Sequence, residues 1–373
     1  MTTQSRGGAE FAAIEMLDAL VDRGHEPVML TDQPEMARDR RVPVRHVEIG
    51  PKLSTTSWRD LMLKWPRLVR DLRKALEAEW PYDVLLVHYK KEQLLAAALP
   101  KRLRATLVWC EWGPIPFPLR KGAPRQAYLG AARAADLILA ISQGTNDNVV
   151  DVGVAPWKVV TVPNVLRTDE IDFSAAGRTR VRDDLRIPRD AFVVGCISRF
   201  HPKKRNDVVV EAVKLLDDER VHLVMAGDGE TEASLREIGA PLGDRLHMVP
   251  TPGGNVGDVL SAFDVSVFCP SPTEGQPRAT ILAMLARRPA LATGPEGVAD
   301  MISPEVGGIA SPENDPTALA ALLQRYLDDP ALVVSQGETG RMLAERTYAA
   351  PVVAELLERL FRQAEAHAAR RRS

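Results

Sequence analysis

Several features that would decide the class of this protein are scarce or missing from its 373 residues. The three cysteines, Cys110, Cys196 and Cys269, are far apart and lie in apolar contexts. They are typical of reduced core residues and exclude a disulfide framework. No apolar run approaches the roughly 18 residues that span a bilayer, and the N-terminus has no apolar signal-peptide segment. We therefore expect a cytoplasmic protein.

An excess of charge of either sign is also missing. The chain has 48 Lys and Arg against 50 Asp and Glu, a formal net charge of -2. Proteins that bind nucleic acids normally carry a marked basic excess, so we expect no nucleic-acid partner. No Asp-x-Asp sequence that could hold a divalent ion follows a strand-like run, and we expect neither a metal nor a bound cofactor.

The chain does contain a regular alternation of short apolar runs and longer amphipathic runs. It is 45% hydrophobic, and its length suits two domains of about 150 to 200 residues. Near-continuous apolar strands separated by helices indicate parallel sheets covered on both faces. We predict an α/β protein with two Rossmann-like, doubly wound domains that face a cleft. The strand-like runs include YDVLLVH, ATLVWC and DLILAIS in the first half and AFVVGCIS, VHLVMAG and DVSVFCP in the second.

The domain boundaries follow from a polar, weakly periodic stretch at residues 166–188, which is typical of a connection. We expect an N-terminal domain over 1–172, a linker over 173–187 and a C-terminal domain over 188–349. Residues 350–373 are amphipathic and then basic, which favours a closing helix that packs back on the N-terminal domain. No strand pattern precedes GGAEFAAIEML, so either the first strand is missing or the true start lies upstream.

Ligands of doubly wound domains bind at the carboxyl ends of the strands, so the residues that follow each strand are the candidates. The loop SRFHPKK carries Arg199 and Lys204, whose guanidinium fork and ammonium point charge suit a diphosphate. The alternative is a solvated basic loop. In AGDGE, Gly227 and Gly229 allow the backbone to approach a ligand, although a turn before a helix also uses glycine.

A third loop, PTEGQPRATILAML, leads into a predicted helix. The backbone amides of Gly275, Gln276 and the residues after Pro277 lie at its N-terminus, whose partial positive charge attracts phosphate. Glu274 beside them is unsuited to phosphate, so we expect it to face sugar hydroxyls or a developing oxocarbenium ion. The alternative is a carboxylate that satisfies the free amides of the helix.

Taken in order, these segments resemble family four of the retaining glycosyltransferases, which have the GT-B fold. The resemblance covers nearly the whole chain, and it is carried by GGAE, RGH, ADLILAISQGTNDNVVDVGVAPWKVVTVPN, SRFHPKK, VMAGDGE, FDVSVFCPSPTEGQP, GGIASPENDPTALAALLQRYLDDP and ERTY. It implies that the residues matching Arg199 and Lys204 bind the donor diphosphate. It also implies that Glu274 contacts the donor sugar near the reacting carbon and that Gly7 and Gly8 approach the diphosphate or the acceptor.

Two residues of the N-terminal half enter through the resemblance. His88 ends YDVLLVH and matches a histidine common at that strand end, where acceptor contact or packing is favoured over a role as base. Family members often place another histidine near the sugar after a later strand. Here that place is Glu111 or Trp112, and Glu111 could take over the polar role.

The chain also departs from the family pattern. The second glutamate, eight positions after the first, is Leu282, and the small glycine after that helix is Arg288. A leucine accepts no hydrogen bond from the nucleotide ribose, and loss of one such bond costs about 0.5–1.5 kcal/mol where water replaces it. These departures favour the main alternative function, a degenerate binding or scaffold subunit. A nucleotide-sugar epimerase is a second alternative, but no cluster of acids and histidines supports it.

The resemblance implies transfer of a sugar from a nucleotide-diphosphate sugar, as co-substrate, to a hydroxyl of a glycan, a lipid-linked or a small-molecule acceptor. The anomeric configuration is retained, and the leaving phosphate takes the acceptor's proton. Residues 58–80 form a basic amphipathic stretch with Trp58 and Trp65. Such a helix suits peripheral contact with an anionic membrane, and the alternative is a solvated surface helix.

Overall fold

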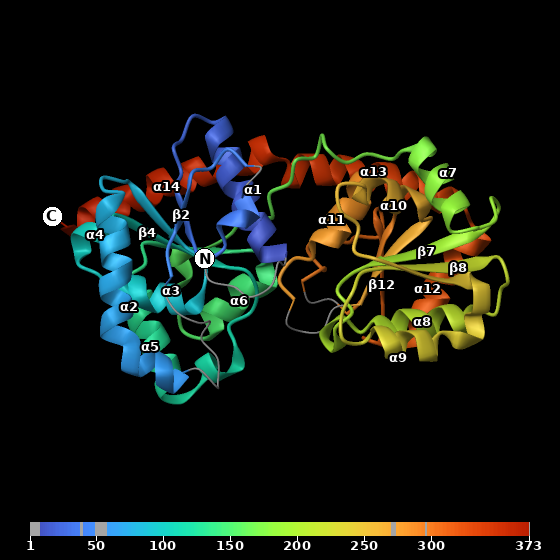
Figure 1. The fold of residues 1–373 in the computed structure, drawn as a ribbon, viewed down its shortest axis with the longest axis horizontal. Coiled ribbons are helices and arrows are strands. Elements are labelled where there is room, and N and C mark those ends of the chain that lie inside the picture. Colours follow the sequence, from blue (N-terminus) through green and yellow to red (C-terminus); the bar gives the residue numbers. More distant parts are fainter. Residues whose placement is uncertain (1–7, 38–39, 49–57, 270–273, 295–296, 373) are drawn as a thin grey trace. The chain divides into compact units, whose positions relative to one another are not determined.

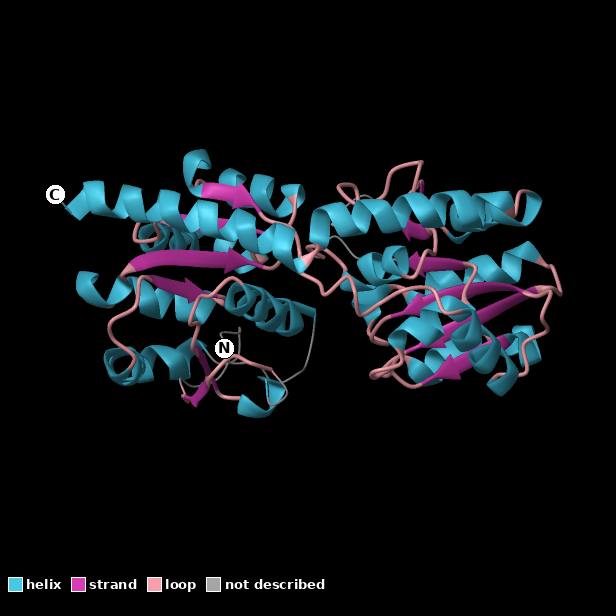
Figure 2. Cartoon of the chain, turned by 90° about the horizontal axis from the view of Figure 1, so that it is seen from above, coloured by secondary structure: helices cyan, strands magenta, loops and turns pink. Residues whose placement is uncertain are grey.

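The structure is a computed structural model that describes residues 8–37, 40–48, 58–269, 274–294 and 297–372. The chain divides into two compact units, Met1–Leu166 with Ala350–Ser373, and Arg167–Ala349. In each unit, helices lie on both sides of parallel strands (Figure 2). The α/β class with two Rossmann-like domains is therefore confirmed.

The strands of the N-terminal unit form two parallel sheets. The larger has the order β3-β4-β5-β6, and β1 pairs with β2 alone among the described strands. The strands are β1 (Met29–Thr31), β2 (Val44–His46), β3 (Val84–Val87), β4 (Thr106–Glu111), β5 (Leu137–Ala140) and β6 (Val159–Thr161).

Two apolar layers cover this unit's sheet, because side chains alternate along each strand. Leu107 and Trp109 of β4 join a cluster with α2, α3, α5 and α6, whereas Val108 and Cys110 join one with α1 and α14. The helices are α1 (Gly8–Asp22), α2 (Trp58–Ala78), α3 (Lys90–Ala97), α4 (Lys101–Arg104), α5 (Gly122–Ala132), α6 (Gln143–Asp151) and α14 (Ala350–Arg372).

The C-terminal unit has one parallel sheet in the order β12-β11-β10-β7-β8-β9. Helices α8, α9 and α12 cover one face, and α7, α10, α11 and α13 lie on the other (Figure 1). The strands are β7 (Phe192–Ile197), β8 (Val221–Ala226), β9 (Leu246–Val249), β10 (Val265–Phe268), β11 (Ala290–Thr293) and β12 (Gly307–Ala310). The helices are α7 (Ala175–Asp184), α8 (Asn206–Leu216), α9 (Glu232–Ile238), α10 (Val256–Ala262), α11 (Arg278–Leu285), α12 (Pro316–Asp328) and α13 (Ala331–Tyr348).

The stretch expected to be a linker, residues 173–187, is instead part of the C-terminal unit, so that expectation is wrong. Ser174 caps α7 by accepting a hydrogen bond from the Gly177 amide. Arg178 and Arg182 then bind the carbonyls that end α10 and the carboxylate of Asp264. The two arginines, which suggested a solvated connection in the sequence, therefore anchor α7 to the rest of the unit.

All three cysteines, Cys110, Cys196 and Cys269, are buried and free. Burial raises the pKa of the Cys196 thiol to about 11, so it is protonated at neutral pH and poorly reactive. In the described ranges, no helix is both long enough and apolar enough to cross a membrane.

Candidate active site

The candidate site lies at the carboxyl edge of the C-terminal sheet. Strands β10, β7 and β8 are neighbours and parallel, so the loops that follow them leave the sheet at the same edge. Lys204 lies on the loop after β7, and Glu274 lies on the loop after β10. The Lys204 ammonium donates a hydrogen bond of 2.5 Å to Oε1 of Glu274. Both side chains are about one-fifth exposed. The Lys204 Nζ also lies 5.1 Å from the centre of the Phe268 ring, a cation–π distance.

The loop that carries Lys204 is fixed by a buried asparagine that the sequence analysis missed. Asn206 begins α8 and is 3% exposed. Its Oδ1 accepts a hydrogen bond from the Ser198 hydroxyl at 2.8 Å, and its Nδ2 donates to the Arg199 carbonyl at 3.3 Å. Because one side chain holds both ends of the loop, the cations between them are pre-positioned.

Arg199 and Lys204 have different surroundings. The Arg199 side chain is exposed and makes no ion pair or hydrogen bond with a described residue, whereas Lys204 is paired with Glu274. Arg199 is therefore available to an incoming anion. Lys204 keeps two further N–H donors, because an ammonium has three.

Gly227 and Gly229 have a packing role in addition to the ligand approach predicted for them. A Cβ on Gly227 would lie 2.0 Å from the Ser198 carbonyl oxygen, and one on Gly229 would lie 2.3 Å from that of Phe200. The Phe200 amide also donates to the Asp228 carbonyl at 2.8 Å. The two loops therefore touch backbone to backbone, which only glycine permits here.

The segment from Glu274 to α11 forms the third part of the site. Gly275 and Pro277 are buried, Gln276 is half-buried, and Pro277 caps α11 without a side-chain acceptor for the first amides. Thr280 in the first turn is 3% exposed, and its hydroxyl has no hydrogen-bond partner among the described residues. Such a helix start suits an oxyanion.

Gly297 supports this segment and was missed by the sequence analysis. It has a φ of +72°, and a Cβ there would lie 2.6 Å from the Gly275 carbonyl oxygen and 2.8 Å from that of Glu274. The positive φ and the close approach both require glycine. The GPEG sequence at 294–297 was the available signal, because clustered glycines mark tight turns.

The two departures from the family pattern have structural partners. Leu282 of α11 is half-buried and packs against the apolar cluster that includes Val193 and Val224. Arg288 is 9% exposed, and its guanidinium lies 4.5 Å from the centre of the Phe173 ring. Position 282 therefore contributes packing where the family places a polar contact.

Glu111, a candidate for sugar contact, is buried and bound by side chains of its own domain. It is 3% exposed, and its Oε1 accepts hydrogen bonds from Tyr128 at 3.1 Å and Gln93 at 3.2 Å. Its Oε2 pairs with Lys90. The carboxylate is thus enclosed and bound by its own domain, which leaves little capacity for a substrate hydroxyl.

His88 is half-buried and bound to a tryptophan. The indole N–H of Trp112 donates to Nδ1 of His88 at 3.2 Å, and the two rings stack at 5.6 Å. Burial lowers the pKa of His88 to about 3. Since indole is only a donor, Nδ1 is unprotonated and the ring proton is on Nε2. His88 can donate a hydrogen bond through Nε2, but it is unsuited to act as a base there.

The glycines at the N-terminus are only partly described. Gly7 lies outside the described residues, and Gly8 is the exposed first residue of α1. In the first turn of that helix, Glu10 accepts a hydrogen bond of 2.5 Å from the hydroxyl of Tyr89. Tyr89 lies just after β3. Glu10 is 6% exposed, so it ties the start of α1 to the carboxyl edge of this sheet.

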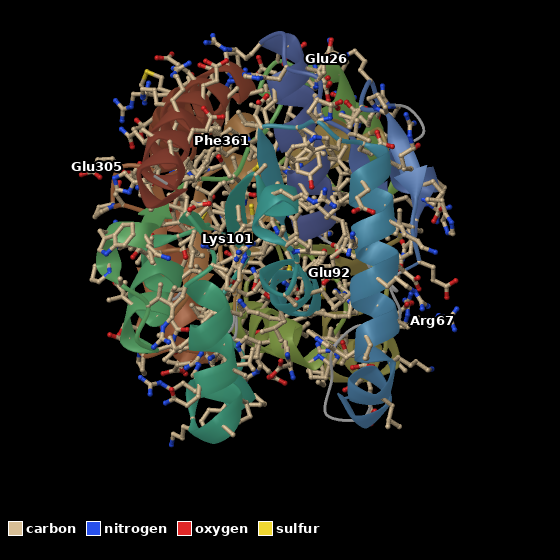
Figure 3. All side chains as sticks on the ribbon, turned by 90° about the vertical axis from the view of Figure 1, so that its left-hand side faces the viewer. Glu26, Arg67, Glu92, Lys101, Glu305 and Phe361 are labelled. Atoms are coloured by element: carbon tan, nitrogen blue, oxygen red, sulfur yellow. The ribbon has the colours of Figure 1, made fainter. Side chains whose placement is uncertain are left out.

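Several basic residues of α2 are paired with acidic residues of the same helix. Arg67 points outward (Figure 3) and lies 3.5 Å from Asp71, and Arg73 lies 2.9 Å from Glu77. Paired charges attract an anionic membrane less than free ones do. This arrangement favours the solvated surface helix over the membrane contact. Within the described part of the chain, no three His, Cys, Asp or Glu side chains are grouped to hold a metal ion.

Comparison with known proteins finds a matching family model for a large part of each unit. Residues 6–170 match the model described as Glycosyltransferase Family 4, and residues 191–329 match Glycosyl transferases group 1. A D-inositol 3-phosphate glycosyltransferase of Streptomyces avermitilis is 26% identical, covering 92% of this chain and 80% of the relative. A 2-deoxystreptamine glucosyltransferase of Streptomyces kanamyceticus is 27% identical, covering 71% and 73%.

Solved structures share the fold over almost the whole length. Alr3699/HepE of Anabaena, solved with UDP and glucose, has a TM-score of 0.80 at 18% identity, covering 96% of this chain and 97% of its own. Sucrose-phosphate synthase of Thermosynechococcus elongatus has a TM-score of 0.77 at 20% identity, covering 96% and 94%. The predicted GT-B architecture is thereby confirmed.

Proposed function

We propose that the chain is a glycosyltransferase, which moves a sugar from a nucleotide-diphosphate sugar to an acceptor hydroxyl with retention of configuration; the matched family models and the GT-B fold support this proposal. The observation that carries the proposal is the Lys204–Glu274 pair at 2.5 Å, with Arg199 on the same loop as Lys204. The pair places a cation for the leaving phosphate beside a carboxylate for the sugar. UDP is the first nucleotide to test, because the solved neighbour Alr3699/HepE binds it.

In the proposed reaction, the C-terminal domain neutralises the diphosphate. Arg199 offers a fork of N–H donors, Lys204 offers its two remaining donors, and the amides at the start of α11 add partial positive charge. Lys204 and the helix start are held in place before the donor binds, so these groups need little reorganisation when negative charge develops on the leaving oxygen. The same groups make a metal unnecessary, and we propose metal-independent transfer with no bound cofactor.

Glu274 would support the sugar as positive charge develops at its anomeric carbon. The bond from this carbon to the phosphate oxygen breaks while the bond to the acceptor oxygen forms on the same face. The acceptor's proton passes to the departing phosphate oxygen, so atoms and charge balance without a covalent enzyme intermediate. A carboxylate nearby stabilises such an oxocarbenium-like state.

The acceptor would bind to the N-terminal domain, where His88 could orient a hydroxyl through its Nε2–H. A glycan, a lipid-linked sugar and a small polyol all remain candidate acceptors, and the names of the two relatives given above favour a cyclitol among the small molecules. We propose peripheral membrane contact through α2 only if the acceptor is lipid-linked.

The test is a titration of the full chain with UDP, GDP and ADP, followed by transfer assays with labelled nucleotide sugars. We expect thermal stabilisation by one nucleotide, because a ligand that binds only the folded state stabilises it, and transfer from the matching donor without added metal. The anomeric proton coupling of the product reports retention. If no nucleotide stabilises the protein, the binding or scaffold alternative, which Leu282 favours, replaces this proposal.

A further inference from the structure

The C-terminal unit has a second candidate site at the opposite edge of its sheet. A cavity of about 570 Å³ is lined by Ala191 and Phe192 at the start of β7, by Asp264 just before β10 and by Arg288 just before β11. In a parallel sheet these are the amino ends of the strands, whereas Lys204 follows a carboxyl end. The cavity is therefore separate from the candidate active site.

Positive charge exceeds negative charge beside this cavity. Arg178 Nη2 lies 2.6 Å from Oδ1 of Asp264, and Arg182 Nη2 lies 2.8 Å from Oδ2 of the same residue. Both oxygens of this one carboxylate thus serve two guanidinium groups. Arg288 borders the same cavity and makes no ion pair with a described carboxylate, so three cations share one anion.

Arg288 is held by two carbonyl oxygens and an aromatic ring but by no carboxylate within ion-pair distance among the described residues. Its Nε donates to the Ala286 carbonyl at 3.1 Å and its Nη1 to the Phe263 carbonyl at 3.2 Å, while the Phe173 ring lies 4.5 Å from its guanidinium carbon. Burial, and then the charge of Arg178, lower its pKa to about 10. Its Nη2 donates to no described residue, so the fork keeps free donors in a place where a cation is costly to leave unpaired.

The remaining lining gives the cavity a charged rim and an apolar wall. Arg189 is exposed and has no described partner, whereas Arg287 is paired with Asp172 at 2.9 Å and with Glu338. Among the charged lining residues, the acids are Asp190, Asp264 and Glu338, against the arginines 178, 189, 220, 287 and 288. The apolar wall is built by Phe173, Phe192, Tyr326, Leu327, Val333 and Val334.

We infer that this cavity binds a small organic anion that has a phosphate or carboxylate head and an apolar body. The head would meet the free donors of Arg288, whose planar fork matches the oxygens of either group. The body would lie against the aromatic wall. The volume is within the range of small-ligand pockets, about 300–1,000 Å³. The inference does not depend on the proposed function, because no residue of the donor site takes part.

Calorimetric titration of the full chain tests this inference, and a repeat with excess UDP shows whether the probes compete with UDP for one site. Phenyl phosphate and benzoate carry the two head groups on one body, phenol lacks the anion, and inorganic phosphate lacks the body. We expect saturable one-to-one binding of phenyl phosphate or benzoate. Phenol should bind at least about tenfold more weakly because it lacks the charge-assisted hydrogen bonds, and inorganic phosphate should do so because it buries no apolar surface. Which of the two binds tighter identifies the head group.

Variants locate the binding. Arg288→Gln should weaken the preferred probe at least about tenfold, and Arg189→Glu at the exposed rim should weaken it several-fold without touching the core. Arg346→Glu is the matched control, because Arg346 is an exposed arginine of α13 that does not line the cavity, and it should change affinity less than about twofold. If Arg288→Gln does not fold, Arg189→Glu decides alone.

Three results would overturn the inference. The first is absence of saturable binding by both phenyl phosphate and benzoate. The second is equal binding of phenol, which would show a purely apolar pocket. The third is equal weakening by Arg189→Glu and Arg346→Glu, which would show a non-specific effect of net charge.

Discussion

Replacing Glu274 with glutamine separates the proposed catalytic role from nucleotide binding. Glutamine keeps the length of the side chain, and its Oε1 still accepts a hydrogen bond from Lys204, now 2.5 Å from the carboxylate. What is lost is one negative charge that is about four-fifths shielded from water. The change therefore tests the charge rather than the shape of the site.

The expected loss of transfer is large. Removal of one pre-positioned electrostatic group from an active site typically lowers kcat by about 10²–10³-fold, roughly 2.7–4 kcal/mol of transition-state stabilisation. The folded state loses less, about 1 kcal/mol, because a charge-assisted hydrogen bond becomes a neutral one. UDP affinity should change by no more than about threefold, since the cations that face the diphosphate remain and each tenfold change needs about 1.4 kcal/mol.

Initial transfer rates with the preferred donor and calorimetric titration with UDP measure the two effects on the same protein. Glu230→Gln is the matched control, because Glu230 lies on the neighbouring loop after β8 and its side chain is 65% exposed. Transfer by Glu274→Gln at the native rate would refute the catalytic role. If the variant loses both transfer and UDP binding, Glu274 instead acts by holding Lys204 in position.

Four further predictions address other parts of the molecule. Gly227→Ala should destabilise the folded state by about 1–3 kcal/mol through overpacking, which lowers the thermal unfolding midpoint, and it should weaken UDP binding. Gly253→Ala is the control and should change neither, because no atom lies within 4 Å of the new Cβ. Leu282→Glu should tighten UDP binding about two- to tenfold, the range of one added hydrogen bond; weaker binding would show that packing at this position dominates. The Arg23 hydrogen bond lowers the pKa of Glu358 to about 2 from 4.5, so the stability that Glu358 contributes is complete above pH 4.5 and is lost as the pH falls toward 2. The melting temperatures of Glu358→Gln and the parent should differ at pH 7 and converge near pH 2. Nitrogen-15 spectra of His88 should show a neutral ring with its proton on Nε2 from pH 5 to 8, and titration inside that range would contradict the assignment.

The fold was predictable because burial on both sheet faces leaves a strong pattern in the sequence. Strands such as β7 and β8 are apolar along almost their whole length, and the loops after them contain the candidate site residues. The linker prediction failed because Arg178 and Arg182 look solvated in a sequence, although they bind carbonyl oxygens that lie about 80 residues away.

Contacts between distant segments were the part that the sequence could not supply. Lys204 and Glu274 were both named as candidates, but their pairing joins residues 70 positions apart. The partners of Glu111 were hidden for the same reason, because Lys90 and Tyr128 approach it from separate helices. The family pattern identifies which positions carry chemistry, and only three-dimensional contacts show which of their lone pairs and protons are already used.

The course of the last helix has a consequence for how the protein is made. Val353 and Leu357 of α14 share a core with Met16 of α1, so residues at the two ends of the chain complete one domain. During synthesis, the first domain must wait with an uncovered apolar face until residues 350–372 have been translated. Cutting the gene after residue 166 would give not two working halves but one half that lacks part of its own interior.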